Sequence, residues 1–235
     1  TATMPDWVDV LLPACGVVDG GSNVYTPRSE GPGSNVKTLT IGVYEDGVRK
    51  LLTGAVGNAN LVLPTGRVAY IEYTFTGIWN PVTDVAILTP TYPTDAALRY
   101  AAANIQYNSL GLCNEQVSMD FGNEVIMREC ETSASGYESG LITNRTPTMT
   151  VNPESALVAT DDRYGRWLSA TESQMQITLD GPSDSTIVIT APKAQMMNIQ
   201  EGDRNGIQVD DIELQLNQDP ANADTEFTIT FNEAT

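Results

Sequence analysis

The stretch TLTIGVYEDGVRKLL, residues 38–52, decides the fold class of this 235-residue chain. Two runs rich in β-branched, aromatic and aliphatic residues, 38–44 and 48–52, flank Glu45-Asp46-Gly47. Asp-Gly between two such runs is typical of a tight hairpin, because both residues tolerate the positive φ that its turn needs. The stretch therefore predicts a pair of antiparallel strands.

Strand signals recur along most of the chain. In residues 67–76, side chains at even positions alternate with the apolar set Ala69, Ile71, Tyr73 and Phe75, which is the period of a half-buried strand. Further strands are expected at 60–63, 115–120, 124–130, 174–179 and 186–191. Phe121-Gly122-Asn123 is read as a hairpin turn between 115–120 and 124–130, and Asp180-Gly181-Pro182 as a second one.

The last part of the chain, residues 206–232, is expected to form a C-terminal β-hairpin. Asn205-Gly206 supplies the turn before it, because this pair adopts positive φ at little cost. The apolar residues change from odd to even numbers at Asp210-Asp211, which predicts a β-bulge at that dipeptide. Phe227, Ile229 and Phe231 are assigned to the partner strand.

Two helices are expected. A short one lies in the N-terminal arm, residues 1–16, with its apolar face on Trp7, Val10 and Leu11. A longer one is predicted at 154–169, capped by Asn152 and Pro153. Its apolar residues, which are expected to pack on the sheet, are Leu157, Tyr164, Trp167 and Leu168. Removing Trp167 from such a contact would cost about 3 to 5 kcal/mol.

The segment 101–107 is open between helix and strand. Its alanines favour a helix, whereas Asn104 to Tyr107 alternate as in a strand. Residues 20–33 and 81–94 are rich in Gly or Pro and too long for simple connections, so they are expected to be functional loops or extended arms. The chain as a whole, 1–235, is expected to be a single domain with a mainly β fold.

Composition excludes several classes of function. The chain has 12 basic and 30 acidic residues, a net charge of −18, and no histidine. Without histidine there is no Ser-His-Asp triad, HExxH zinc protease or Cys/His zinc finger. The charge is opposite to that of a nucleic-acid-binding groove. No cofactor, metal or membrane span is expected, and Cys15, Cys113 and Cys130 are expected to be free thiols in a reducing cytoplasm.

Five segments, in this order, resemble the tail tube proteins of long-tailed (siphovirus-type) bacteriophages. They are Val43-Tyr44-Glu45-Asp46-Gly47, Thr53-Gly54-Ala55-Val56-Gly57-Asn58, Tyr73-Thr74-Phe75-Thr76-Gly77-Ile78, Phe121-Gly122-Asn123-Glu124-Val125 and Glu201-Gly202-Asp203-Arg204-Asn205-Gly206. The last two are the most specific. The resemblance extends from about Pro5 to the C-terminus, and its weight lies in the order and coverage of the segments.

The resemblance implies a two-sheet β-sandwich or barrel-like subunit with one flanking α-helix and extended loops. It implies a structural virion protein and not an enzyme: a major tail tube subunit whose hexameric rings stack into a tube that conducts DNA during ejection. Tape-measure and other tail proteins are then the partners, with assembly in the host bacterial cytoplasm and the virion tail as final location. The resemblance also favours strand over helix at 101–107.

An acidic inner wall would let DNA slide, because it repels the phosphates. The candidate lumen-facing acids are Asp120, Glu124, Glu129, Asp211 and Glu213. For any one of them, an outer solvated face is an equally good reading. Two other functions stay open: a secreted β-sandwich binding or adhesin module, and a glycosidase that uses a pair among the 30 carboxylates.

Overall fold

The structure is a computed structural model that describes residues 7–29, 36–92, 99–101, 103–181 and 185–232. It confirms a mainly β fold, with 61% strand and 6% helix. Neither helix in the described part is long and apolar enough to cross a membrane. The helices are α1 (Val8–Ala14) and α2 (Arg163–Leu168). The strands are β1 (Val17–Asp19), β2 (Val24–Pro27), β3 (Leu39–Glu45), β4 (Val48–Pro64), β5 (Tyr70–Asp84), β6 (Asn104–Tyr107), β7 (Leu110–Gly111), β8 (Asn114–Asp120), β9 (Asn123–Glu129), β10 (Tyr137–Arg145), β11 (Thr148–Pro153), β12 (Glu172–Asp180), β13 (Thr186–Arg204), β14 (Ile207–Leu216) and β15 (Thr228–Asn232).

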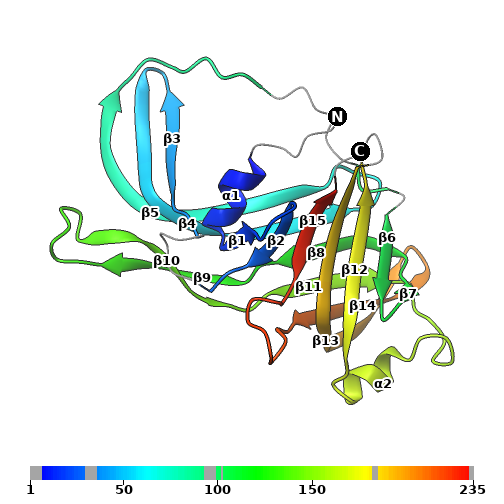
Figure 1. Cartoon of the computed structure of the whole chain (residues 1–235). Helices are drawn as coiled ribbons and strands as arrows, with labels where there is room; N and C mark the ends of the chain where they lie inside the picture. Colours follow the sequence, from blue (N-terminus) through cyan, green and yellow to red (C-terminus); the bar gives the residue numbers. More distant parts are fainter. Residues whose placement is uncertain (1–6, 30–35, 93–98, 102, 182–184, 233–235) are drawn as a thin grey trace.

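The main sheet of the described residues has the order β1-β2-β15-β13-β14-β11-β8-β4-β3, with β5 beside β4, β12 beside β13, and β6 on the other side of β12. The long strand β13 joins its two halves, because residues 186–190 pair with β15 and residues 194–204 pair with β14. One hydrophobic cluster contains side chains from both halves, including Met119, Leu214, Met175 and Ile189. The sheet therefore folds over on itself around a shared core, as in a sandwich (Figure 1).

The hairpin predicted at 38–52 is confirmed as β3 and β4. Asp46 and Gly47 have φ values of 45° and 83°, as the turn requires. Strand β4 is longer than predicted, because the segments 48–52 and 60–63 belong to one strand. It bends near Gly54, whose φ is 60°, and the register with β5 shifts between Thr53 and Val56.

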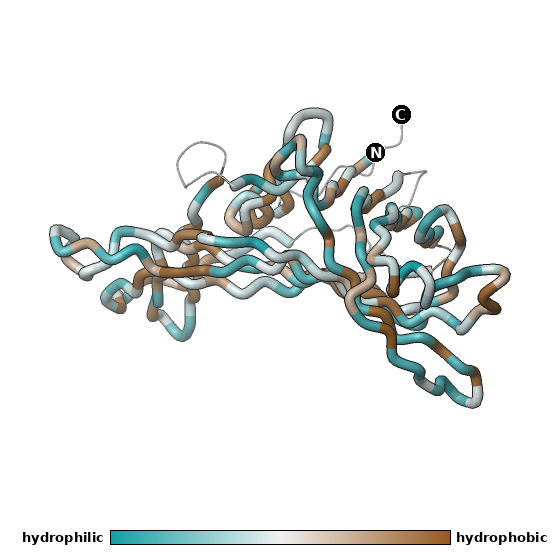
Figure 2. The backbone as a smooth tube through the Cα atoms, turned by 90° about the horizontal axis from the view of Figure 1, so that it is seen from below, coloured by the Kyte–Doolittle hydropathy of each residue, from teal (hydrophilic) through white to brown (hydrophobic). Residues whose placement is uncertain are grey.

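The prediction of a hairpin at Phe121-Gly122-Asn123 is wrong. Strand β8 pairs with β4 and β11, whereas β9 pairs with β10 in a separate two-stranded sheet. The chain leaves the main sheet at Gly122, which has a φ of 65°. The hairpin β9–β10 packs against β4 and β5, where Gly140 lies beside Val56, and its turn end extends outward in both views (Figure 1 and Figure 2).

Two predictions for the C-terminal part are also wrong. Strands β14 and β15 do not pair with each other, because β15 lies between β13 and β2. The ladder between β13 and β14 runs through Asp210 and Asp211 without a shift, and its bulge lies between Met196 and Asn198. The change of phase in the sequence has another cause: Asp210 is buried on the core side in an ion pair.

The long helix predicted at 154–169 is reduced to α2. Asn152 does not cap a helix, because its Oδ1 accepts hydrogen bonds from the backbone N–H groups of Glu115 and Gln116 on β8. The cap is Asp162, which accepts from the backbone N–H of Gly165 at 2.8 Å. The proposed apolar face is not docked, since Leu157 and Leu168 are 78% and 79% exposed.

Three smaller predictions have mixed outcomes. The N-terminal helix exists, but it buries Val8 and Leu12 and leaves Trp7 and Val10 exposed. Residues 104–107 form strand β6, as the resemblance implied. The arm at 81–94 begins as the end of β5 and continues without regular structure to residue 92, while 93 and 94 lie outside the described residues. Of the arm at 20–33, the described part includes β2, and 30–33 lie outside it.

Candidate functional site

One side of the main sheet, across β4, β8, β11, β14 and β13, is covered by polar side chains. These residues, which we name the polar face, are Asn60, Gln116, Ser118, Asp120, Thr148, Thr150, Asn152, Asn198, Gln200, Asp211, Glu213 and Gln215. They alternate along each strand with buried core residues such as Val117, Met119, Met149, Ile212 and Leu214. The alternation of β-strand side chains therefore places all of them on the side away from the core.

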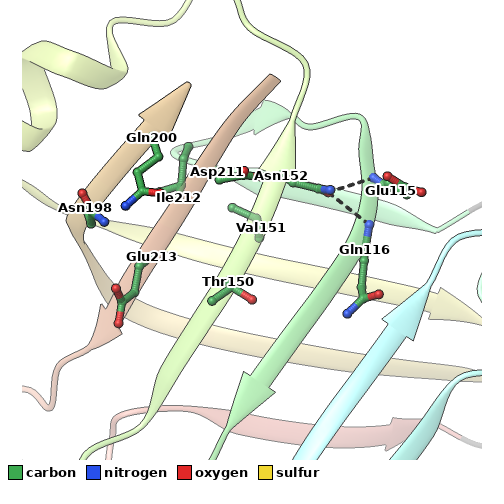
Figure 3. Close-up of a pocket in the computed structure, with 10 residues that line it drawn as sticks. All are labelled: Glu115, Gln116, Thr150, Val151, Asn152, Asn198, Gln200, Asp211, Ile212 and Glu213. Carbon is green, nitrogen blue, oxygen red and sulfur yellow. Dashed lines mark hydrogen bonds between the residues drawn. The ribbon is translucent and has the colours of Figure 1, made fainter. Parts of the chain in front are cut away.

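The strand register puts these side chains into rows across the sheet. In one row, Ser118 faces Thr150, which faces Glu213, which faces Asn198. The hydroxyl oxygens of Ser118 and Thr150 are 2.6 Å apart. The rows line an open hollow of about 580 Å³, in which Asn152 reaches over to β8 (Figure 3). Amide, hydroxyl and carboxylate groups thus line most of the hollow, together with Val151 and Ile212.

The polar face lacks positive charge. No Lys or Arg occurs in β8, β11 or β14. The basic residues of β4 are Arg49 and Lys50, in the part that pairs with β3, and those of β13 are Lys193 and Arg204, near its bend and its end. Lys193 lies 3.7 Å from Glu172, and Arg204 lies 2.9 Å from Glu154. The charge of the polar face therefore comes from its carboxylates alone, and it will repel anions.

The structure divides the five predicted lumen acids into groups. Asp211 and Glu213 are exposed on the polar face and line the hollow. Asp120 lies on the same face, but its Oδ1 accepts hydrogen bonds of 2.7 Å from Asn58 Nδ2 and from the backbone N–H of Gly122. Glu124 and Glu129 are exposed on β9, in the separate hairpin. The five residues therefore do not form one site.

Sequence reasoning missed most of the polar face, because it searched for charged residues. Glu115 lines the hollow, and Glu72 on β5 pairs with Asn60, which extends the acidic surface toward the edge of the sheet. The uncharged amides and hydroxyls of β8 and β11 were also overlooked. Their strict alternation with Val117, Met119, Met149 and Val151 is the signal that could have found them.

The other clustered ionisable groups are engaged in structural contacts. Arg163 binds the carboxylates of Asp161 and Asp210 at 2.7 and 2.6 Å, and all three side chains are buried. Burial raises the pKa of Asp161, but hydrogen bonds from Arg166 and Arg163 outweigh it and hold that pKa below its ordinary value. The Asp161 carboxylate therefore stays ionised and paired with arginine, which makes it a poor acid or base.

The buried thiol and the possible metal ligands of the described residues are likewise unsuited to catalysis. Cys15, Cys113 and Cys130 are free thiols, as predicted. Burial raises the pKa of the buried Cys15 thiol to about 12, which keeps it in the unreactive protonated form. Within the ranges that the structure describes, no three His, Cys, Asp or Glu side chains are grouped so that they could hold a metal ion. What the polar face offers is a negative, hydrogen-bonding surface.

Neither a protein-family model nor a curated protein sequence matches this chain. A function is therefore inferred from the polar face, the hairpin β9–β10 and the five sequence segments given above.

Proposed function

We propose that this chain is the major tail tube subunit of a long-tailed bacteriophage. In this proposal its hexameric rings stack into a tube, the polar face lines the lumen, and DNA passes through without specific binding. The observation that carries the proposal is the polar face with Asp120, Asp211 and Glu213, whose central strands β8, β11 and β14 have no Lys or Arg.

Such a surface suits transport of a polyanion. A Lys or Arg that contacts a phosphate releases counterions and gains binding free energy, so a wall with fixed cations would hold the DNA. Exposed carboxylates repel the phosphates, and side-chain amides and hydroxyls keep the wall hydrated. A hydrated acidic wall therefore reduces friction on passing DNA.

The sequence segments that resemble tail tube proteins also support the proposal, because three of them meet in space. Residues 53–58 of β4 pair with residues 74–78 of β5. Asn123, from a third segment, donates from its backbone N–H to Asn58 Oδ1 at 3.0 Å and from its side chain to the Gly57 carbonyl at 3.1 Å. Segments far apart in the chain thus meet where β4 and β5 of the main sheet contact the start of the β9–β10 hairpin.

Electron microscopy of the purified protein tests the proposal. Stacked rings, or hollow tubes whose wall is about one subunit thick, are the expected result. A monodisperse monomer at high protein concentration would contradict it, and glycan binding by such a monomer would favour a secreted binding module instead.

A further inference from the structure

The main sheet has two open edges on opposite sides. In the described part of the chain, β5 pairs only with β4, which leaves its outer edge unpaired from Tyr70 onward. Strand β12 accompanies β13 only as far as Gln195, so the corresponding edge of β13 from Met196 to Arg204 has no neighbouring strand there, and of its carbonyls that of Met197 accepts a hydrogen bond from Trp167 on α2. Open edges present free N–H and C=O groups and readily accept a further strand.

The directions of these strands make the two edges complementary. The order across the sheet is β5-β4-β8-β11-β14-β13, and each neighbouring pair is antiparallel. Strands β5 and β13 therefore run in opposite directions. When the β13 edge of one copy lies beside the β5 edge of another, the antiparallel sheet continues and each copy keeps one free edge. This is a head-to-tail contact, which can close into a ring.

The charges at the two edges are opposite at the same end of the sheet. The row Val62, Ser118, Thr150, Glu213 and Asn198 begins opposite Tyr70 at the start of β5 and ends on β13. The residues that follow Asn198 on β13 therefore lie at the same end of the sheet as the residues that precede Tyr70 on β5.

Glu201 and Asp203 follow Asn198 and are exposed, and Glu201 Oε1 also accepts a hydrogen bond of 3.3 Å from the Tyr164 hydroxyl. Arg67 precedes Tyr70, and Arg99 belongs to the bridge with Val68; both are exposed and form no ion pair with a described residue. A head-to-tail contact brings these arginines to the acids.

Exposed apolar side chains accompany both edges. Trp167 donates from Nε1 to the Met197 carbonyl on the open edge of β13, and Trp167, Leu168 and Met197 are all exposed. Val68 and Tyr70 are exposed at the other edge. A second copy would cover both groups, which accounts for the exposure of Trp167 and Leu168 in the single subunit.

From these observations we infer that the β5 edge of one subunit pairs with the β13 edge of the next, with Arg67 and Arg99 facing Glu201 and Asp203. The partner is a second copy of this chain. The inference rests on the proposed function, because that function requires copies to associate into rings, and it names the surface by which they do so.

Charge reversal at one edge at a time tests the pairing. One variant carries Arg67→Glu and Arg99→Glu, and the other carries Glu201→Arg and Asp203→Arg. Each alone meets like charges in the next subunit, so the concentration at which rings form should rise about tenfold or more. In a mixture, each edge of one variant meets the opposite charge on the other, and rings of alternating subunits should return. Light scattering and electron microscopy measure both effects.

Controls keep the result clear. Arg128→Glu makes the same change on the exposed hairpin β9–β10 and should leave ring formation unchanged. Circular dichroism checks folding, and Arg67→Gln with Arg99→Gln replaces the first variant if that one does not fold. Unchanged assembly of the single-edge variants, or folded variants that assemble neither alone nor mixed, would overturn the edge pairing alone. A monomeric wild type would overturn the proposed function as well, whereas edge-dependent rings that never stack would overturn only the tube.

Discussion

Asn58 Nδ2 lies 2.7 Å from Asp120 Oδ1, and this hydrogen bond joins β4 to the last residue of β8. The same carboxylate oxygen accepts from the backbone N–H of Gly122, where the chain leaves the main sheet. Asp120 therefore fixes the start of the hairpin β9–β10, and these two hydrogen bonds partly offset its negative charge.

Asp120→Ala should lower the free energy of unfolding by about 1–3 kcal/mol, because it leaves the partly buried donors of Asn58 and Gly122 without this acceptor. Urea titration followed by circular dichroism measures the change. Glu213→Ala on the same face is the matched control, since Glu213 is exposed, and its effect should stay within about 0.5 kcal/mol. Equal effects of the two changes would rule out a structural role for Asp120.

Gly122→Ala should destabilise the protein by about 3 kcal/mol or more, because a Cβ there collides with the backbone of Thr146 and φ is 65°. Gly136 has a similar φ of 76°, but a Cβ there meets no atom within 4 Å. Gly136→Ala should cost only about 1 kcal/mol, the penalty of the positive φ itself. Thermal unfolding of both variants separates the steric clash from the backbone strain.

Phe121→Ala should cost about 3 to 5 kcal/mol, because Phe121 is fully buried against Phe227. Trp167→Ala should cost about 1 kcal/mol in the isolated subunit, since Trp167 is 40% exposed and contacts β13 through a hydrogen bond to the Met197 carbonyl without entering the core. Denaturant unfolding of the monomer compares the two. A loss of 3 kcal/mol or more for Trp167→Ala would restore the docked helix expected from the sequence.

The stability of the subunit should fall in acid. The pKa of Asp161 is lowered in the folded state from an ordinary value of 3.8, and that of Asp224 is lowered through hydrogen bonds from Ser29 and Arg145 that outweigh its burial. A carboxyl with a lowered folded-state pKa stabilises the fold above its unfolded pKa and loses this contribution as pH falls through the folded pKa. The free energy of unfolding should therefore decrease as the pH falls below about 4.

Asp161→Asn tests the origin of this acid sensitivity. At pH 7 the variant should be less stable by about 3 kcal/mol, because Arg166 loses its carboxylate partner and the buried Arg163 keeps only Asp210. Its unfolding free energy should then depend less on pH below 4. An unchanged slope of stability against pH would show that other carboxylates cause the effect.

Glu213→Lys should slow DNA ejection from assembled tails without preventing tube formation, because it places a ring of cations at each level of the wall. Glu129→Lys, on the hairpin β9–β10, is the matched change away from the polar face and should leave ejection unchanged. Fluorescence of a DNA-binding dye during ejection measures the rate. Equal ejection rates for both variants and the wild type would contradict the repulsive wall.

The sequence by itself determined the class of the fold and the turns that depend on single residues. Asp46-Gly47 and Asn205-Gly206 form the predicted turns, because positive φ is a local property that few residues tolerate. Alternation predicted where β5 lies, because one side of a half-buried strand must be apolar. Net charge and the absence of histidine likewise required no structure.

Only the tertiary structure decided which strands pair and which polar residues share a surface. Phe121-Gly122-Asn123 has the composition of a hairpin turn, yet hydrogen bonds from Asn123 to Asn58 and Gly57 direct the chain into a separate sheet. Asp210 faces the core because Arg163, 47 residues earlier in the chain, neutralises it. Strand pairing and ion pairing depend on residues distant in sequence, so local patterns cannot specify them, and the polar face exists only once five strands are in register.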